Sequence, residues 1–203
     1  PEDLGLLGVE AGAGASLPLV SRREVLPPVP RQTSYDAAII GTWTWQPNLI
    51  GLRWFLDQVV PHLPRDFSVR IAGDLPISLN SPHPGVRFMG RVPDALEFLR
   101  GGRVVPLFSR AGTGVQLKTI ETFELGLPAV ATTLSLRGIE ARPANCHVAD
   151  DPLEFAAAMV RTARQIAGDL DGREFHVRQR ISLDEALRRG LRSLAFPRAR
   201  IAA

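Results

Sequence analysis

Four residues between positions 112 and 121 have the types and order needed to hold a phosphate group and a sugar. Gly112 and Gly114 allow a sharp backbone turn that can approach a ligand closely. Lys118, the only lysine of the chain, can neutralise negative charge, and the Glu121 carboxylate can accept hydrogen bonds from sugar hydroxyls. A second interpretation stays open, because Lys118 and Glu121 at this spacing also form ordinary surface ion pairs, each worth about 0.3 kcal/mol.

The neighbouring residues predict the elements that would position this segment. Residues 104–108 form an apolar run that predicts a buried strand, and residues 115–125 predict a helix that ends at the glycine and proline that follow. Leu117, Ile120 and Phe123 recur at helical spacing and predict a stripe that faces the core. A strand, a glycine loop and a helix in this order place free N–H groups and the positive end of a helix dipole together. The segment therefore predicts an anion site, most naturally for phosphate.

The same segment resembles the nucleotide-sugar site of retaining glycosyltransferases, in the family glycosyl transferases group 1. The resemblance lies in GTGVQLKTIE at 112–121, GLPAVAT at 126–132 and RGI at 137–139. It covers about residues 36 to 190 and is most specific at 109–139. It implies an α/β fold with a Rossmann-like parallel sheet and helices on both faces, as the C-terminal half of a GT-B architecture of two facing Rossmann domains.

The resemblance also implies roles for individual residues. Glu121 is expected to bind the ribose hydroxyls of the donor, and Arg110 and Lys118 are expected to act as catalytic residues that meet the charge on the departing diphosphate. Many members carry a further glutamate that touches the donor sugar, where this chain has Thr113, so the identity of the sugar stays open. The diphosphate and sugar are expected to meet four residues of the loop: Gly112, Thr113, Gly114 and Val115.

Two other loops are expected to complete the site. Gly41 and Thr42 follow the first predicted strand and would let the donor approach, while Trp45 would wall the site; the alternative is a turn with two tryptophans packed for stability. Much of the family has an arginine and a lysine in this loop, and this chain lacks that clamp. Arg91 and Val92 match the family loop that meets the nucleobase.

Alternating strand and helix patterns run along the chain and predict a parallel sheet covered on both faces. The helix that begins near Pro47 is expected to end before Pro61. Asp94 and either Asp150 or Asp151 are expected to cap two later helices. The strands are expected at 37–40, 67–72, 86–89, 104–108, 129–132 and 147–149.

The domain organisation follows from a change in composition. Residues 1–33 are expected to be an N-terminal arm and interdomain linker, with an apolar, proline-rich stretch at 25–30. Residues 34–203 are expected to form the nucleotide-sugar-binding Rossmann-like domain with C-terminal helices. In the family a similar linker joins the acceptor-binding half to the donor-binding half, so an N-terminal Rossmann half is the expected partner. A natural single-domain protein with a loose arm is the alternative.

Composition and charge exclude several classes of protein. The chain has 203 residues, 45% of them hydrophobic, and its net charge of +3 is too small to indicate nucleic acid as a partner. No apolar run reaches the roughly 18 residues of a membrane-spanning helix, and the start lacks the basic region of a signal peptide. The cytoplasm, with the inner face of the membrane as an alternative, is the expected compartment. No metal and no other cofactor are expected, because the four histidines are scattered and no Asp-any-Asp motif occurs.

The function expected from the resemblance is donor binding for a retaining, hexosyltransferase-type glycosyltransferase of bacterial polysaccharide or glycoconjugate synthesis. The acceptor would be a glycan, lipid or protein bound by the other half, so the chain alone is expected to be inactive. A nucleotide-sugar epimerase of the same fold and a non-catalytic nucleotide-binding or scaffold module are the alternatives. Residues 161–200 are expected to be an arginine-rich helical tail with a solvated face, and peripheral contact with an anionic membrane is the less favoured interpretation.

Overall fold

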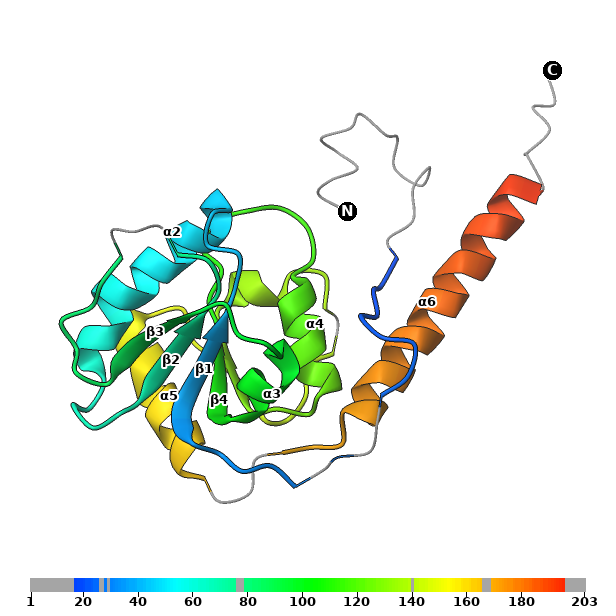
Figure 1. Cartoon of the computed structure of the whole chain (residues 1–203). Coiled ribbons are helices and arrows are strands. Elements are labelled where there is room, and N and C mark those ends of the chain that lie inside the picture. The colour runs from blue at the N-terminus through cyan, green and yellow to red at the C-terminus, as the bar shows by residue number, and fades with distance from the viewer. Residues whose placement is uncertain are drawn as a thin grey trace.

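The computed structural model describes residues 17–25, 28, 30–75, 79–139, 141–165 and 169–195. Among these residues, six strands form one parallel sheet in the order β3-β2-β1-β4-β5-β6 (Figure 1). This order reverses direction between β1 and β4, as in Rossmann-like folds. The strands are β1 (Tyr35–Ile40), β2 (Val69–Ala72), β3 (Val86–Gly90), β4 (Gly102–Leu107), β5 (Ala129–Ala131) and β6 (Cys146–Val148). The predicted α/β class and parallel sheet are confirmed, with strand bounds shifted by one to two residues.

Helices cover both faces of the sheet, because each buried strand presents apolar side chains to both sides. On one face, α2 (Gln46–Trp54) and α5 (Pro152–Arg164) pack on Ile39 and Val104. On the other face, α3 (Ala95–Arg100) and α4 (Leu117–Glu124) pack on Ala38 and Val105. Asp94 caps α3, and Asp151 rather than Asp150 caps α5; each aspartate accepts hydrogen bonds from two backbone N–H groups of its helix.

The helix expected to end before Pro61 is followed directly by a short 3-10 turn that contains this proline. After α2 it passes into a π-helical turn, η1 (Phe55–Val59), and a 3-10 turn, η2 (Val60–His62). Pro61 lies in the first turn of η2, where a backbone N–H is not needed for a helical hydrogen bond, so the proline is tolerated. The α-helical and π-helical part therefore ends before Pro61 as predicted, and the 3-10 turn that follows it was not predicted.

The helix predicted at 115–125 is shorter than expected. α4 begins at Leu117, because Gln116 is extended (φ −86°, ψ 103°), and it ends at Glu124. Ile120 and Phe123 are buried as predicted, but Leu117 is 56% exposed, so the prediction that Leu117 faces the core was wrong. In the same turn of α4, Thr119 and Ile120 are fully buried, so only part of this turn faces the core.

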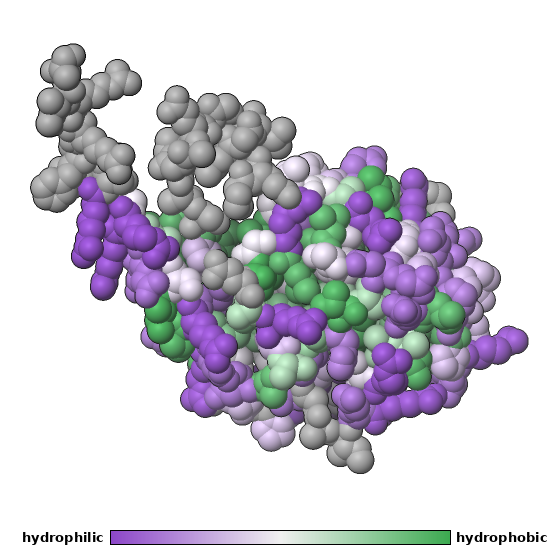
Figure 2. Space-filling model, turned by 180° about the vertical axis from the view of Figure 1, so that it is seen from behind, coloured by the Kyte–Doolittle hydropathy of each residue, from purple (hydrophilic) through white to green (hydrophobic). Residues whose placement is uncertain are grey.

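The C-terminal tail is not one helix. α5 ends at Arg164, residues 169–171 are not helical, and α6 spans Gly172–Ala195 and projects from the body (Figure 1). Residues 166–168 and 196–200, which belong to the predicted tail, lie outside the described residues. On the face of the molecule turned away from the viewer in Figure 1, hydrophilic side chains predominate, including those on the outer part of α6 (Figure 2). Within the described part of the chain, no helix has the length and apolar character needed to cross a membrane.

One buried carboxylate connects α4 to both ends of the chain. Glu124 is fully buried and accepts hydrogen bonds from the backbone N–H and hydroxyl of Ser21. Its other partner is Nδ1 of His176 on α6, at 2.9 Å. The side-chain amide of Gln179 donates to the Leu19 carbonyl oxygen at 3.3 Å. The described part of the predicted arm therefore packs against α4 and α6.

Candidate functional site

A cleft of about 820 Å³ opens at the carboxyl ends of the central strands. Its walls come from four segments far apart in the sequence: residues 40–48 after β1, 73–74 after β2, 91–95 after β3, and 113–121 across the start of α4. In sheets of this type, ligands bind at the point where the strand order reverses, which is where this cleft lies. Eight predicted site residues line it: Gly41, Thr42, Arg91, Val92, Thr113, Val115, Lys118 and Glu121.

The glycine loop borders the cleft in a conformation that requires glycine. Gly112 has φ +101° and Gly114 has φ +80°, values that L-residues rarely adopt. Neither glycine lines the cleft itself. The Arg137 guanidinium donates a hydrogen bond to the Gly112 carbonyl oxygen at 2.8 Å, and Gly138 lies directly against the Val115 side chain. The loop that follows β5 therefore supports the glycine loop from outside.

A buried set of hydroxyl groups fixes the start of this loop. The Ser109 N–H donates to Oγ1 of Thr132 at 3.1 Å and to Oγ of Ser135 at 2.8 Å. The Ser135 hydroxyl donates to the Leu107 carbonyl oxygen at 2.7 Å, and Thr119 on α4 donates to the Ser135 carbonyl oxygen at 3.0 Å. Sequence analysis missed these residues. Their only signal was a run of small hydroxyl residues after the fifth predicted strand.

Lys118 faces the cleft as a largely buried cation. Its ammonium Nζ lies 3.4 Å from Oδ1 of Asn48, and among the described residues it has no carboxylate at ion-pair distance. Burial lowers the pKa of Lys118 from its ordinary value of 10.5, because an ammonium group loses hydration there. The side chain is therefore not half of a surface ion pair with Glu121, the second interpretation that the spacing had left open.

Glu121 lies one turn further along α4 and also lines the cleft. Its side chain is partly buried, and within the described residues its carboxylate accepts no hydrogen bond. A partly desolvated carboxylate without a protein donor has its full accepting capacity available to a ligand. Lys118 and Glu121 thus present a donor and an acceptor to the same cavity.

The two tryptophans of the first loop have different positions. Trp43 is fully buried, and its indole N–H donates to the Ala72 carbonyl oxygen at 2.8 Å. Trp45 is 62% exposed and lines the cleft. The packing interpretation is therefore right for Trp43, and Trp45 stands at the cleft wall. The Asn48 amide donates to the Thr42 carbonyl oxygen at 3.1 Å and orders the turn between them.

The two predicted arginines differ in their relation to the cleft. Arg91 lies on its rim, where the guanidinium forms a two-pronged ion pair with Asp74 at 2.6 to 2.9 Å. Hydrogen bonds from Arg91 lower the pKa of the Asp74 carboxyl group. Arg110 does not line the cleft: its guanidinium carbon lies 4.8 Å from the Trp54 ring centroid, and Nη1 lies 3.5 Å from the Asp150 carbonyl oxygen.

No metal site accompanies these residues in the described part of the chain, where no three histidine, cysteine, aspartate or glutamate side chains gather closely enough to hold an ion. The single cysteine, Cys146, is buried, and burial raises the pKa of its thiol to about 12. At neutral pH that thiol stays protonated and serves as a small apolar core residue.

Comparison with known proteins agrees with this architecture. Residues 35–165 match the family model described as glycosyl transferases group 1. Two solved structures of TarM are similar in fold. One has 14% identity and a TM-score of 0.53 and covers 85% of this chain. The other, a mutant of S. aureus TarM in complex with Fondaparinux, alpha-GlcNAc-glycerol and UDP, has 15% identity and a TM-score of 0.53 and covers 80%. A search of curated proteins found no match.

The chain belongs to the glycosyl transferases group 1, since the family model spans well over half of its length. The similarity in fold extends over only part of the TarM proteins: the chain covers 36% and 34% of the two TarM chains. It thus corresponds to about a third of those proteins.

Proposed function

We propose that this chain is the donor-binding domain of a retaining glycosyltransferase with two facing Rossmann-like domains, and that it forms the C-terminal half. The observation that carries this proposal is the convergence of four sequence-distant loops on one cleft, with Lys118 and Glu121 both facing it. The family match supports sugar transfer as the chemistry. Bacterial polysaccharide or glycoconjugate synthesis is the proposed setting, by family analogy.

The base, the ribose and the diphosphate of a nucleoside-diphosphate sugar would each have a chemical counterpart in the cleft. The base would lie against the loop at Arg91 and Val92, and the ribose hydroxyls would donate to Glu121. The diphosphate would meet the backbone at 113–116 together with the Lys118 ammonium, which would also stabilise the charge on the leaving group. For Arg110 to contribute, its side chain would have to leave the Trp54 ring.

Titration of the chain with UDP, GDP and ADP tests donor binding. The expected result is saturable binding of one diphosphate at least tenfold tighter than the others, because a nucleobase pocket at the Val92 loop discriminates between bases. The acceptor site is proposed to lie in another half of the protein, so the chain should bind the donor without transferring its sugar. Absence of binding to all three at millimolar concentration would favour a scaffold role instead.

Replacement of Lys118 by methionine is expected to weaken binding of the preferred diphosphate about 10-fold to 100-fold, the effect of losing a charge-assisted hydrogen bond. The free chain should not lose stability at neutral pH, because the variant removes a buried charge whose nearest polar partner is a neutral amide. Arg53→Met, an exposed cation on α2, is the matched control and should leave the affinity unchanged. Equal loss in both variants would contradict the assignment.

The depressed pKa of Lys118 predicts a pH dependence. Diphosphate affinity should fall as the pH rises through that pKa, because the neutral amine no longer attracts the anion. In the same window, up to the ordinary value of 10.5, the unfolded chain binds more protons than the folded chain, so stability should rise with pH. Reductive ¹³C-methylation of the only lysine would give its pKa by NMR titration, and bound diphosphate should raise that pKa. An unchanged pKa would show that the ammonium does not contact the ligand.

A further inference from the structure

The side chain of Asn48 connects two walls of the donor cleft, the loop after β1 and α4. Its amide nitrogen Nδ2 donates to the Thr42 carbonyl oxygen at 3.1 Å, and its amide oxygen Oδ1 lies 3.4 Å from Nζ of Lys118. The Thr42 carbonyl oxygen also accepts from the Trp45 N–H at 3.2 Å, so it belongs to the ordered turn of this loop. Asn48 therefore links the Lys118 ammonium to a fixed point of the backbone.

The two partners of Asn48 determine which way its amide faces. A carbonyl oxygen can only accept a hydrogen bond, and an ammonium group can only donate one. The NH₂ group of Asn48 must therefore face Thr42, and its oxygen must face Lys118. Asparagine meets both demands. An aspartate in its place would put an acceptor against the Thr42 carbonyl oxygen, and a leucine would make neither hydrogen bond.

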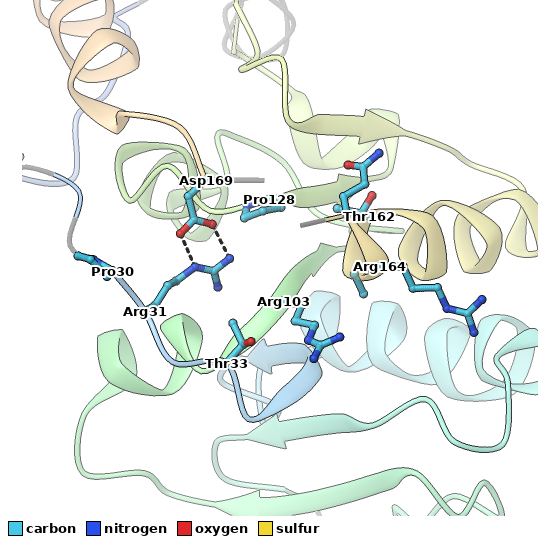
Figure 3. A pocket seen from close by; sticks show the side chains of 10 residues that line it. Pro30, Arg31, Thr33, Arg103, Pro128, Thr162, Arg164 and Asp169 are labelled. Atoms are coloured by element: carbon cyan, nitrogen blue, oxygen red, sulfur yellow. Dashed lines mark hydrogen bonds and ion pairs between the residues drawn. The ribbon is translucent and has the colours of Figure 1, made fainter. Parts of the chain in front are cut away.

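The partner that Asn48 gives to Lys118 is uncharged, which preserves the positive charge of the ammonium group. At another cavity of the chain, Arg31 is instead neutralised by a two-pronged ion pair with Asp169 (Figure 3). An ammonium group has three N–H donors. If one is directed to Asn48, two remain for the oxygens of a ligand.

The other charged groups that line the cleft do not cancel this charge. Arg91 and Asp74 pair with each other on the rim. Glu121 lines the same cleft one turn along α4, and in the described part of the chain it forms no ion pair with Lys118. The ammonium of Lys118 thus remains available to attract an anion into the cleft.

We propose that Asn48 is a positioning residue, which holds the Lys118 ammonium towards the diphosphate of the donor and leaves its charge available to the phosphate oxygens. This inference rests on the proposed function, because it concerns the same cleft. Asn48 acts through Lys118 and does not need to touch the ligand itself. A neutral acceptor suits this task, since a carboxylate in its place would hold the ammonium by charge and repel the phosphates.

A double-mutant cycle with diphosphate binding as the measured quantity tests this role. Asn48→Leu is expected to weaken binding of the preferred nucleoside diphosphate about 5-fold to 20-fold, because the ammonium loses the contact that directs it. In the Lys118→Met background the same replacement should change the affinity by no more than about twofold, since no ammonium remains to be directed. Asn80→Leu, at an exposed asparagine outside the cleft, is the matched control and should bind like the parent.

Equal weakening by Asn48→Leu in both backgrounds would overturn the proposal, because Asn48 would then act through the turn at Thr42 or on the ligand directly. An affinity of Asn48→Leu equal to that of the parent would overturn it as well. Failure of the proposed function is a different result, because it appears in the parent chain as an absence of binding to every diphosphate tested.

The pKa of Lys118 in the free chain gives a second readout, which a purely structural role of Asn48 would not move in the same way. Lys118 is the only lysine, so incorporation of ¹³C-labelled lysine gives one Cε signal to follow in a pH titration by NMR. Asn48→Leu should lower this pKa further, because the charged form loses a hydrogen bond. Asn48→Asp should raise it, because a carboxylate favours the ammonium form, and yet should also weaken diphosphate binding. An unchanged pKa in Asn48→Leu, or tighter binding by Asn48→Asp than by the parent, would contradict the proposal.

Discussion

Replacement of Gly73 by alanine is expected to destabilise the chain by about 3 kcal/mol or more and to disturb the cleft at the carboxyl ends of the strands. Gly73 follows β2 with φ +118°, a backbone conformation that costs a residue with a side chain free energy. A Cβ there would also overlap the Gly41 carbonyl oxygen, which belongs to the backbone and cannot rotate away. Both glycines line the cleft, so the fold and the site share this contact.

Gly90→Ala is the matched control for this variant. Gly90 also has a positive φ (+64°), but a Cβ there would meet no atom within 4 Å. Gly90→Ala should therefore lower the free energy of unfolding only by the backbone strain of an alanine at positive φ, about 1 kcal/mol. Urea unfolding of both variants measures the difference, which combines the overlap with Gly41 and the greater backbone strain of a side chain at φ +118°. Equal stability of the two variants would show that the close approach of β1 and β2 relaxes freely.

Glu121→Gln is expected to weaken binding of the preferred nucleoside diphosphate about 10-fold to 100-fold, because hydrogen bonds to a charged acceptor are worth about 1.5–3 kcal/mol. The amide keeps the size of the side chain but loses the charge and one acceptor. Glu154→Gln, an exposed glutamate in the first turn of α5, is the control and should bind like the parent. Isothermal titration with the diphosphate measures both.

Comparison with the 2′-deoxynucleoside diphosphate tests whether Glu121 contacts the ribose hydroxyls. If Glu121 accepts from the ribose hydroxyls, the parent chain should prefer the ribonucleotide, and Glu121→Gln should lose most of that preference. A variant that binds both nucleotides more weakly but keeps the preference would place Glu121 elsewhere, for example against the sugar or the phosphates. If Glu121→Gln weakens the binding of the ribonucleotide and of the deoxyribonucleotide by the same factor, the ribose assignment is contradicted.

The sequence predicted the layout of the fold well because that layout depends on local pattern. Short apolar runs separated by helical periodicity predicted the parallel strands, and the glycine pair at 112 and 114 predicted a turn that the structure forms with positive φ. Errors occurred where local rules depend on neighbours. The 3-10 turn at Pro61 was not predicted, and Leu117 is 56% exposed although it shares its helical spacing with the buried Ile120 and Phe123.

The candidate site was predicted in part. The loops at 41, 91 and 113 could be assigned to one edge, since the carboxyl ends of parallel strands meet there. The same reasoning could not separate Trp43 from Trp45, because both occur in one loop and only the packing of Trp43 against Ala72 distinguishes them. It also could not show that Arg110 lies over Trp54, since one rotamer of a long side chain decides that contact.

By itself, the sequence determined which segments are strands, which turns need glycine, and which residue types stand at the ends of the strands. The tertiary structure decided what those residues face: Lys118 lies towards Asn48 and the cleft, and Glu121 has no protein donor among the described residues. The physical reason is that periodicity and backbone conformation act over a few residues. Desolvation and hydrogen-bond partnership depend on residues that the strand order brings together from distant parts of the chain.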